Sequence, residues 1–464
     1  MSHSRVTFVM YSLVLVTLLM ARAGRAQVAT NFYSFRSVVG GLEPEYVDLA
    51  QDRSGRIVGT TELSWEGNGV VFRLFPSGAG SQIYEFEGFS SGAFPNGGVM
   101  LATDGNLYGT ATSGGSANGG VLFRITPSGE YAVVYNFGDN SFPYSPPIEA
   151  SDGNLYGVTS GIGGGSYVYR YTRAGTFSVI YSLDVIHGSF AWLPPLQAAD
   201  GNLYVTASQG GTYSCGAILK MTTSGIYLAS YSFPCGAAGN YPVGSLIQAS
   251  DGNFYGTTLA ATVTIGGSSY DTGSIFKITQ AGAVTTLHNF QLDGIDGNSP
   301  DTSLVEGTDG YLYGTTQLGG LTNAGTIFRI SKPGAYSQVY SFTQDVGRFV
   351  RGSIMQHTNG KFYGTTIYGG AHDYGAVYSL DMGLGPFVTF VRATGKIGQT
   401  VQILSQNLTG ATSVTFNGIP ATSFNVVSDT YLTAVVPTGA TTGKVVVTTP
   451  NGALTSNQNF RISN

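Results

Sequence analysis

Aromatic, amide and charged side chains gather in the longer loops between the strand-like segments of this chain. Binding residues concentrate on loops that a rigid scaffold positions. Aromatic rings stack on the C–H faces of sugars, and polar side chains pair with sugar hydroxyls. The pattern favours a glycan or cell-surface polymer as ligand, although such rings also fill gaps within a fold. The candidate ligand-binding residues are Tyr144, His187, Phe190, Trp192, Tyr241, Asp293, Asp296 and Arg348.

Catalytic groups are scarce in the sequence. The His residues are spread over the chain, and none forms an H-E-x-x-H motif. A glycosidase needs two converging carboxylates, and Asp293 with Asp296, or Glu43 with Glu45, share only a loop. We therefore assign no catalytic residue and no cofactor, and we expect a non-enzymatic binding or surface-interaction protein. An extracellular polysaccharide hydrolase or lyase and a purely structural envelope protein are the alternatives.

Two further features concern metals and redox chemistry. Each Asp-Gly turn carries a single Asp, whereas a calcium loop needs several carboxylates, so we expect hairpin turns and no metal. Cys215 and Cys235 flank a hairpin whose turn is Thr222 to Gly225. Folding the chain there brings the two thiols close together, which predicts a disulfide in an exported protein.

Tandem repeats of about fifty residues dominate the chain. Each repeat contains four short strand signals joined by tight turns, the pattern of an up-and-down antiparallel sheet. Seven such sheets predict a seven-bladed β-propeller over residues 27–382. The unit Asp-Gly-Asn-Leu-Tyr-Gly-Thr and its variants start at Asp104, Asp152, Asp200, Asp251, Asp309 and Asn359, with a degenerate first copy from Asp52.

The strand count predicts how the ring closes. The last third-strand segment, Gly375 to Leu380, has no fourth strand after it, while the strand signal Asn31 to Phe35 precedes the first repeat. We expect this N-terminal strand to complete the seventh blade, because an unpaired sheet edge invites pairing with other chains. The first strand of each repeat then lines the central channel.

These motifs resemble the tandem Gloeo-Verruco repeat of exported bacterial proteins, from residue 28 to about 382. The similarity rests on D-G-N-L-Y-G-T, G-G-V-L-F-R-I, a P-S-G turn and V-Y-N-F, which recur in register. It implies a propeller and little about activity.

A different pattern begins after a short Gly-rich step at residues 382–385. Residues 386–464 lack the repeat unit and alternate apolar and polar residues, as an immunoglobulin-like sandwich does. The segments L-T-G-A-x-x-V-x-F-N-G and G-x-V-x-V-x-T-P-x-G resemble the IPT/TIG domain, which implies a spacer or interaction module.

Composition and the N-terminus indicate the compartment. Residues 1–26 read as a signal peptide, with Arg5 before an apolar run and small residues around Ala26. We expect a secreted, periplasmic or cell-surface monomer with no transmembrane segment in the mature chain. Charged residues make up only 10% of the sequence and form no basic block, which argues against a nucleic-acid partner.

Overall fold

The computed structural model describes residues 28–463 except 37–40, 65–66, 162–164, 237–238 and 266–267. The predicted signal peptide lies outside these residues. The described part is an all-β structure, in which η1 (Phe89–Ser91) is a 3-10 turn between strands. No helix in this part is long and apolar enough to cross a membrane.

Seven antiparallel sheets follow one another along the repeats, and we number them 1 to 7 in chain order. Sheets 1 to 3 consist of β2 (Ala50–Gln51), β3 (Ile57–Thr61), β4 (Val70–Leu74) and β5 (Gly80–Glu85); β6 (Val99–Leu101), β7 (Leu107–Ala111), β8 (Val121–Ile125) and β9 (Tyr131–Asn136); and β10 (Ile148–Glu149), β11 (Leu155–Ser160), β12 (Ser166–Tyr171) and β13 (Phe177–Ser182).

Sheets 4 to 7 repeat this order with small additions. They consist of β14 (Leu196–Gln197), β15 (Leu203–Ala207), β16 (Ala217–Met221) and β17 (Tyr227–Ser232); β18 (Asn240–Pro242), β19 (Ile247–Gln248), β20 (Phe254–Ala260), β23 (Ser274–Ile278) and β24 (Val284–Asn289); β26 (Val305–Glu306), β27 (Leu312–Thr316), β29 (Thr326–Ile330) and β30 (Tyr336–Ser341); and β31 (Met355–Gln356), β32 (Phe362–Thr366), β33 (Ala376–Leu380) and β1 (Ala29–Ser34).

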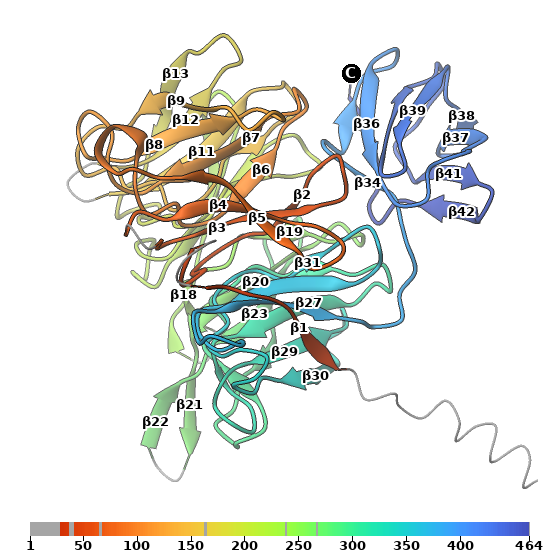
Figure 1. Cartoon of the computed structure of the whole chain (residues 1–464). Helices are drawn as coiled ribbons and strands as arrows, with labels where there is room; N and C mark the ends of the chain where they lie inside the picture. The colour runs from red at the N-terminus through yellow and green to blue at the C-terminus, as the bar shows by residue number, and fades with distance from the viewer. Residues whose placement is uncertain are drawn as a thin grey trace, which may run out of the picture.

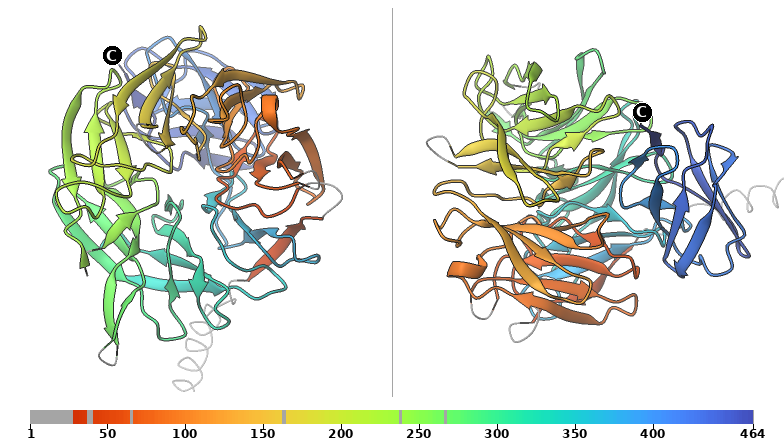
Figure 2. Two further views of the ribbon diagram at one scale, coloured as in Figure 1. Left: turned by 90° about the vertical axis from the view of Figure 1, so that its left-hand side faces the viewer. Right: turned by 90° about the horizontal axis from the view of Figure 1, so that it is seen from above.

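The sheets are arranged around a common centre in chain order, so that the first and the last lie side by side (Figure 2, left). β1 pairs with β33, with Ala29 opposite Leu380 and Ser34 opposite Ala376. This is the pairing that the strand count predicts. Just after β1, the fully buried Phe35 packs edge-on against Phe72 of sheet 1, at a ring-centroid distance of 5.1 Å. The N-terminal strand therefore joins both ends of the repeat array.

The repeat motif has a local physical reason in each sheet. Asp152 Oδ1 accepts the backbone N–H of Asn154, and Oδ2 accepts the Tyr156 hydroxyl at 2.7 Å, so the carboxylate ties the turn to the next strand. The following Gly157 lies opposite Tyr169, whose ring leaves no room for a Cβ. Among the described residues, no three His, Cys, Asp or Glu side chains gather as metal ligands.

The one repeat without this glycine supports the same explanation. Val205 replaces the glycine in sheet 4. Its partner across the ladder is Leu219, where the other six sheets have Phe or Tyr. A side chain at this position is thus tolerated where the opposing residue is not aromatic.

Neighbouring sheets are joined by a repeated hydrogen bond, which we call the seam clasp. The acceptor is the side chain of a Gln or Glu that ends the first strand of a sheet. The donor is a backbone N–H in the preceding sheet, from the turn residue two positions after the end of its own first strand. Six of the seven seams have it, at 2.7–3.1 Å. The donor and acceptor pairs are Thr103 and Glu149, Ser151 and Gln197, Ala199 and Gln248, Ser250 and Glu306, Thr308 and Gln356, and Thr358 and Gln51.

The seam between sheets 1 and 2 differs, because Leu101 occupies the clasp position. There the C-terminal strands supply the contact. Leu404 and Tyr431 belong to the same buried apolar cluster as Leu101, and the Arg53 guanidinium lies 4.9 Å from the Tyr431 ring centroid. The hydroxyl of Thr430 also donates to the Arg53 carbonyl at 2.8 Å.

The C-terminal strands form two four-stranded sheets and one short parallel pair (Figure 1). Both four-stranded sheets contribute to one buried cluster that includes Ile403, Leu432, Phe416 and Val447. The strands are β34 (Thr389–Phe390), β36 (Thr400–Leu404), β40 (Tyr431–Val435) and β39 (Phe424–Ser428); β38 (Ile419–Pro420), β37 (Ser413–Phe416), β41 (Val445–Thr449) and β42 (Gly452–Thr455); and β35 (Thr394–Gly395) with β43 (Arg461–Ile462).

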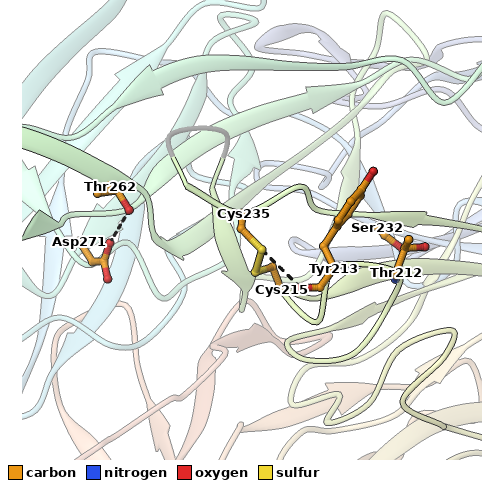
Figure 3. Close-up of a disulfide and its surroundings, with 7 residues drawn as sticks. All are labelled: Thr212, Tyr213, Cys215, Ser232, Cys235, Thr262 and Asp271. Carbon is orange, nitrogen blue, oxygen red and sulfur yellow. Dashed lines mark hydrogen bonds between the residues drawn. A yellow bond between two sulfur atoms is a disulfide. The ribbon is translucent and has the colours of Figure 1, made fainter. Parts of the chain in front are cut away.

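A disulfide joins Cys215 to Cys235, with the two Cα atoms 5.5 Å apart (Figure 3). The two residues lie just outside the β16–β17 hairpin, on the loops that precede β16 and follow β17. Beside it, the Thr212 N–H donates to Ser232 Oγ at 3.0 Å. The covalent bond therefore ties together two loops at one end of sheet 4.

Substitution Gln51→Leu tests the seam clasp between sheets 1 and 7. It leaves the N–H of the fully buried Thr358 without its acceptor, and we expect a loss of about 1–3 kcal/mol in the free energy of unfolding. Urea unfolding measures it. Gln82→Leu is the matched control, because the exposed Gln82 amide donates only to Glu85, and it should cost less than about 0.5 kcal/mol. Equal losses would mean that the clasp adds no stability.

Candidate functional site

The longer loops of all repeats lie at one end of the sheets, which we call the loop end. In an antiparallel sheet, the loops from second to third strand and from fourth strand to the next sheet share an end. Short ladders between these two kinds of loop confirm it. They include Leu42 with Leu63, Ala93 with Ser113, Ser189 with Gln209, Arg348 with Tyr368, and β25 (Gly297–Asn298) with β28 (Leu318–Gly319).

Each inter-sheet loop has a non-glycine residue with a left-handed backbone at an equivalent position, and several loops have a second one elsewhere. The φ angles at the equivalent position range from 43° to 58°, a region that costs an L-residue roughly 1–2 kcal/mol. In six of the seven, the carbonyl accepts an N–H at the end of the second strand, from its last residue or the next one; Ser208 N–H to the Phe190 carbonyl, at 2.9 Å, is an example. The seven residues are Glu43, Phe94, Phe142, Phe190, Tyr241, Ser299 and Phe349.

In each inter-sheet loop, the residue two positions after the left-handed one occupies an equivalent position. We call these seven the loop ring. They are Glu45, Asn96, Tyr144, Trp192, Val243, Asp301 and Arg351. Three neighbouring pairs are in direct contact: Arg351 with Glu45, Arg351 with Asp301, and Tyr144 with Trp192.

One part of the loop ring is an acidic arc around a single guanidinium. Arg351 forms an ion pair with Glu45, and its Nε lies 3.5 Å from Asp301 Oδ2. It also lies 5.1 Å from the Tyr46 ring centroid. Gln317, with its amide oxygen turned toward Arg351, accepts from Nη2 at 2.9 Å and from Nε at 2.8 Å. Arg351 therefore connects the loops that lead into sheets 6, 7 and 1.

The arc continues from Glu45 to Glu62 and Asn96. Burial, followed by the hydrogen bond to Glu45, raises the pKa of Glu62 to about 7, and Asn96 also hydrogen bonds to Glu62. Burial raises the pKa of Asp301 to about 7, against the opposing charge of Arg351. In this part of the described structure, Asp301 Oδ1 and Asn96 Oδ1 are buried without a hydrogen-bond partner.

The other part of the loop ring is aromatic. Tyr144 and Trp192 have ring centroids 4.7 Å apart and an interplanar angle of 54°. The indole N–H of Trp192 donates to Ser208 Oγ at 3.0 Å, which fixes the ring while 37% of the residue stays exposed. Burial, then the charge of Glu62, raises the pKa of Tyr144, so the aromatic pair lies within electrostatic reach of the arc.

Three other predicted residues have roles in the loops themselves. His187 Nδ1 lies 2.9 Å from Asp184 Oδ2, and its ring centroid lies 4.6 Å from that of Tyr227. Phe190 and Tyr241 are left-handed residues, whose backbone groups hold the loops. All three residues precede the loop-ring residue of their own loop by at least two positions, so their side chains are not part of the loop ring.

The predicted acidic pair and Arg348 are also engaged elsewhere. Asp293 Oδ1 accepts the N–H groups of Ile295 and Asp296. The carboxylate of Asp296 is buried and bonds to His288 at 2.9 Å and to the Tyr336 hydroxyl at 2.6 Å. Arg348 Nη2 lies 3.1 Å and 3.2 Å from the two oxygens of Asp373. These contacts stabilise the loops, and no carboxylate pair forms between Asp293 and Asp296.

Of the eight predicted residues, Tyr144 and Trp192 come together, and the acidic arc was not among the candidates. A sequence signal for the arc does exist. In each repeat the ring residue follows a two-residue step such as Phe-Pro, Phe-Ala or Ser-Pro, so that aligning the repeats puts Glu45, Asp301 and Arg351 in one column with Trp192.

The fold and the repeat motif define an all-β protein of tandem repeats. The model of the Gloeobacter/Verrucomicrobia repeat matches residues 20–191, 143–270 and 194–425, and the chain therefore belongs to this repeat family. None of the curated proteins compared matches the chain.

Several solved structures are similar at low sequence identity. The extracellular domain of a putative hybrid two-component system from B. thetaiotaomicron is 12% identical, with a TM-score of 0.49; the match covers 94% of this chain and 55% of that one. A putative 6-phosphogluconolactonase from Bacteroides uniformis is 15% identical, with a TM-score of 0.45 and coverages of 82% and 97%. A gluconolactonase from Xanthomonas campestris is 12% identical, with a TM-score of 0.40 and coverages of 78% and 92%.

The buried Asp301 predicts a pH dependence of stability. An unfolded Asp titrates near pH 4 and the folded one near 7, so between these values the folded chain binds more protons and stability falls as pH rises. In urea unfolding at pH 4.5 and 7.5, Asp301→Asn should remove at least about 1 kcal/mol of this fall, the equivalent of one pKa unit.

Asp293→Asn is the control for that experiment. Backbone N–H donors lower the pKa of Asp293, so its contribution to stability is present above the unfolded pKa and is lost as pH falls. This variant should keep the decline between pH 4.5 and 7.5. If Asp301→Asn kept it too, burial of Asp301 would not be its cause.

Proposed function

We propose that this protein is an exported, non-enzymatic binding protein whose loop ring holds a glycan or cell-surface polymer. The observation that carries the proposal is the Tyr144–Trp192 pair, two rings from adjacent inter-sheet loops with the Trp192 indole fixed by Ser208 and still exposed. Aromatic faces held in this way suit the C–H faces of a pyranose, and a preorganised ring loses little entropy on binding.

The proposal includes the architecture around this site. The seven sheets are the blades of a seven-bladed β-propeller closed by β1, over residues 27–382. Residues 386–464 are an IPT/TIG-type, immunoglobulin-like domain that acts as a spacer or docking module. We call the end of the sheets with the Asp-Gly turns, opposite the loop end, the turn end. Contacts such as the hydrogen bond from Gln402 Nε2 to the Thr103 carbonyl, at 2.7 Å, support a position of this domain at the turn end. A signal peptide cleaved near Ala26 exports the monomeric chain.

One observation favours a second function, that of a polysaccharide hydrolase or lyase. Glu62 and Asp301 have pKa values raised to about 7, mainly by burial. A carboxylic acid in this range is suited to general acid or base catalysis near neutral pH. The acidic arc, rather than Asp293 and Asp296, is then the place where such chemistry would occur.

A glycan array with the full chain tests the proposal, with Trp192→Ala as the variant. Losing the exposed ring should weaken binding of any glycan hit at least tenfold, if a sugar face stacks on it about as strongly as a nucleic-acid base does on an aromatic side chain, about 1–3 kcal/mol. Ile186→Ser is the matched control, since Ile186 is in the same loop and is 72% exposed; it should leave binding unchanged.

Three outcomes separate the alternatives. An array without hits, or equal binding by Trp192→Ala, contradicts the glycan proposal. New reducing ends released from a bound polysaccharide would favour the hydrolase, and release that produces unsaturated ends would favour the lyase.

A further inference from the structure

We propose that the loop ring recognises a protonated primary amine on a sugar, so that the preferred ligand is a glycan with free amino groups. This inference rests on the proposed glycan-binding function and specifies the substrate class of the same site. It derives from an imbalance between hydrogen-bond acceptors and donors in the acidic arc.

Two buried acceptors of the arc lack a partner. The side chain of Asp301 is 8% exposed, and Asn96 is 6% exposed. Within the described residues, neither Asp301 Oδ1 nor Asn96 Oδ1 receives a hydrogen bond. Buried polar groups in native proteins are almost always paired, and an unpaired one costs roughly 1–3 kcal/mol. A ligand that brings donors would satisfy both atoms.

Two donor side chains of the ring, by contrast, are already engaged. Arg351 donates to Glu45 and to the oxygen of Gln317, and it lies against Asp301. The indole N–H of Trp192 donates to Ser208. A ligand group that needs donors from the protein therefore finds few at these residues. An ammonium group has three donors and no acceptor, whereas a hydroxyl brings both.

The charges of the arc point to the same ligand. Three carboxyl groups, those of Glu45, Glu62 and Asp301, surround the one guanidinium of Arg351 in the described arc. Because the pKa values of Glu62 and Asp301 are raised to about 7, these two groups are charged mainly above pH 7. In that range an ammonium supplies the positive charge that balances them. A charge-assisted hydrogen bond to a carboxylate is also roughly twice as strong as a neutral one.

The aromatic part of the ring indicates that the amine belongs to a sugar. Tyr144 and Trp192 are members of the same ring as the arc, and the charge of Glu62 reaches Tyr144. In the proposed complex, a pyranose stacks on these rings and carries a substituent amine to the carboxyl groups. An aromatic face also attracts a cation directly, by about 0.5–2 kcal/mol.

Calorimetry with the full chain at pH 7, where Glu62 and Asp301 are partly ionised, tests the inference, using hexamers of glucosamine and of N-acetylglucosamine as probes. The two differ in the charge of the nitrogen, and we expect at least tenfold tighter binding of the glucosamine hexamer. Asp301→Asn and Asn96→Leu should each reduce this preference. Asp345→Asn, in an exposed part of the loop that carries Arg351, is the control that removes a carboxylate outside the arc and should preserve the preference.

The contradicting outcomes are distinct from one another. Equal affinity for the two hexamers overturns the amine inference and leaves the glycan function standing. No binding of either hexamer, together with an array without hits, overturns both. A lysine pentapeptide that binds as tightly as the glucosamine hexamer overturns the sugar specificity. Salt weakens interactions between charges. If binding of the glucosamine hexamer does not weaken between 50 and 300 mM NaCl, the ion pairing is overturned, and this test does not need a folded variant.

Discussion

A strand from the beginning of the chain completes the sheet formed at the end of the repeats. Ala29 lies opposite Leu380, and sheet 7 thereby gains its fourth strand. The adjacent Phe35 packs on Phe72 of sheet 1, and Gln51 of sheet 1 accepts the Thr358 N–H of sheet 7. These contacts close the ring, and a closed ring fixes the distance between every pair of neighbouring loops. The loop ring depends on this, because its members belong to seven different loops.

The two ends of the sheets carry different contacts. At the turn end, the seam clasps join neighbouring sheets, and the C-terminal strands cover the seam where Leu101 replaces the Gln or Glu. Glu149 combines both functions, because it accepts the Thr103 N–H and lies 3.4 Å from Arg392 of the C-terminal strands. At the loop end, strained left-handed residues hold the side chains of the loop ring in place. The seam clasps are therefore at one end of the sheets, and the unpaired oxygens of Asp301 and Asn96 are at the other.

The repeats, their four strands and the pairing of the N-terminal strand could be predicted because they follow from local patterns. Asp152 and its equivalents form turns through their own neighbours, and Gly157 is small because Tyr169 lies opposite. The loop ring depends on contacts between loops about fifty residues apart, which no local pattern contains. Tyr144 and Trp192 were found because their side chains are unusual. Arg351 and Asp301 were not found, since their place in the site depends on the contact between their side chains, which lie on different loops.

Removing residues Val28 to Phe35 tests the closure of the ring most directly. Hydrogen exchange with thermal unfolding, on a chain that starts at Arg36 and on one that starts at Val28, is the measurement. The account predicts that the shorter chain loses amide protection in β33 and across the seam between sheets 1 and 7, and that its melting temperature falls by several degrees. An unchanged melting temperature with full protection of β33 would contradict it.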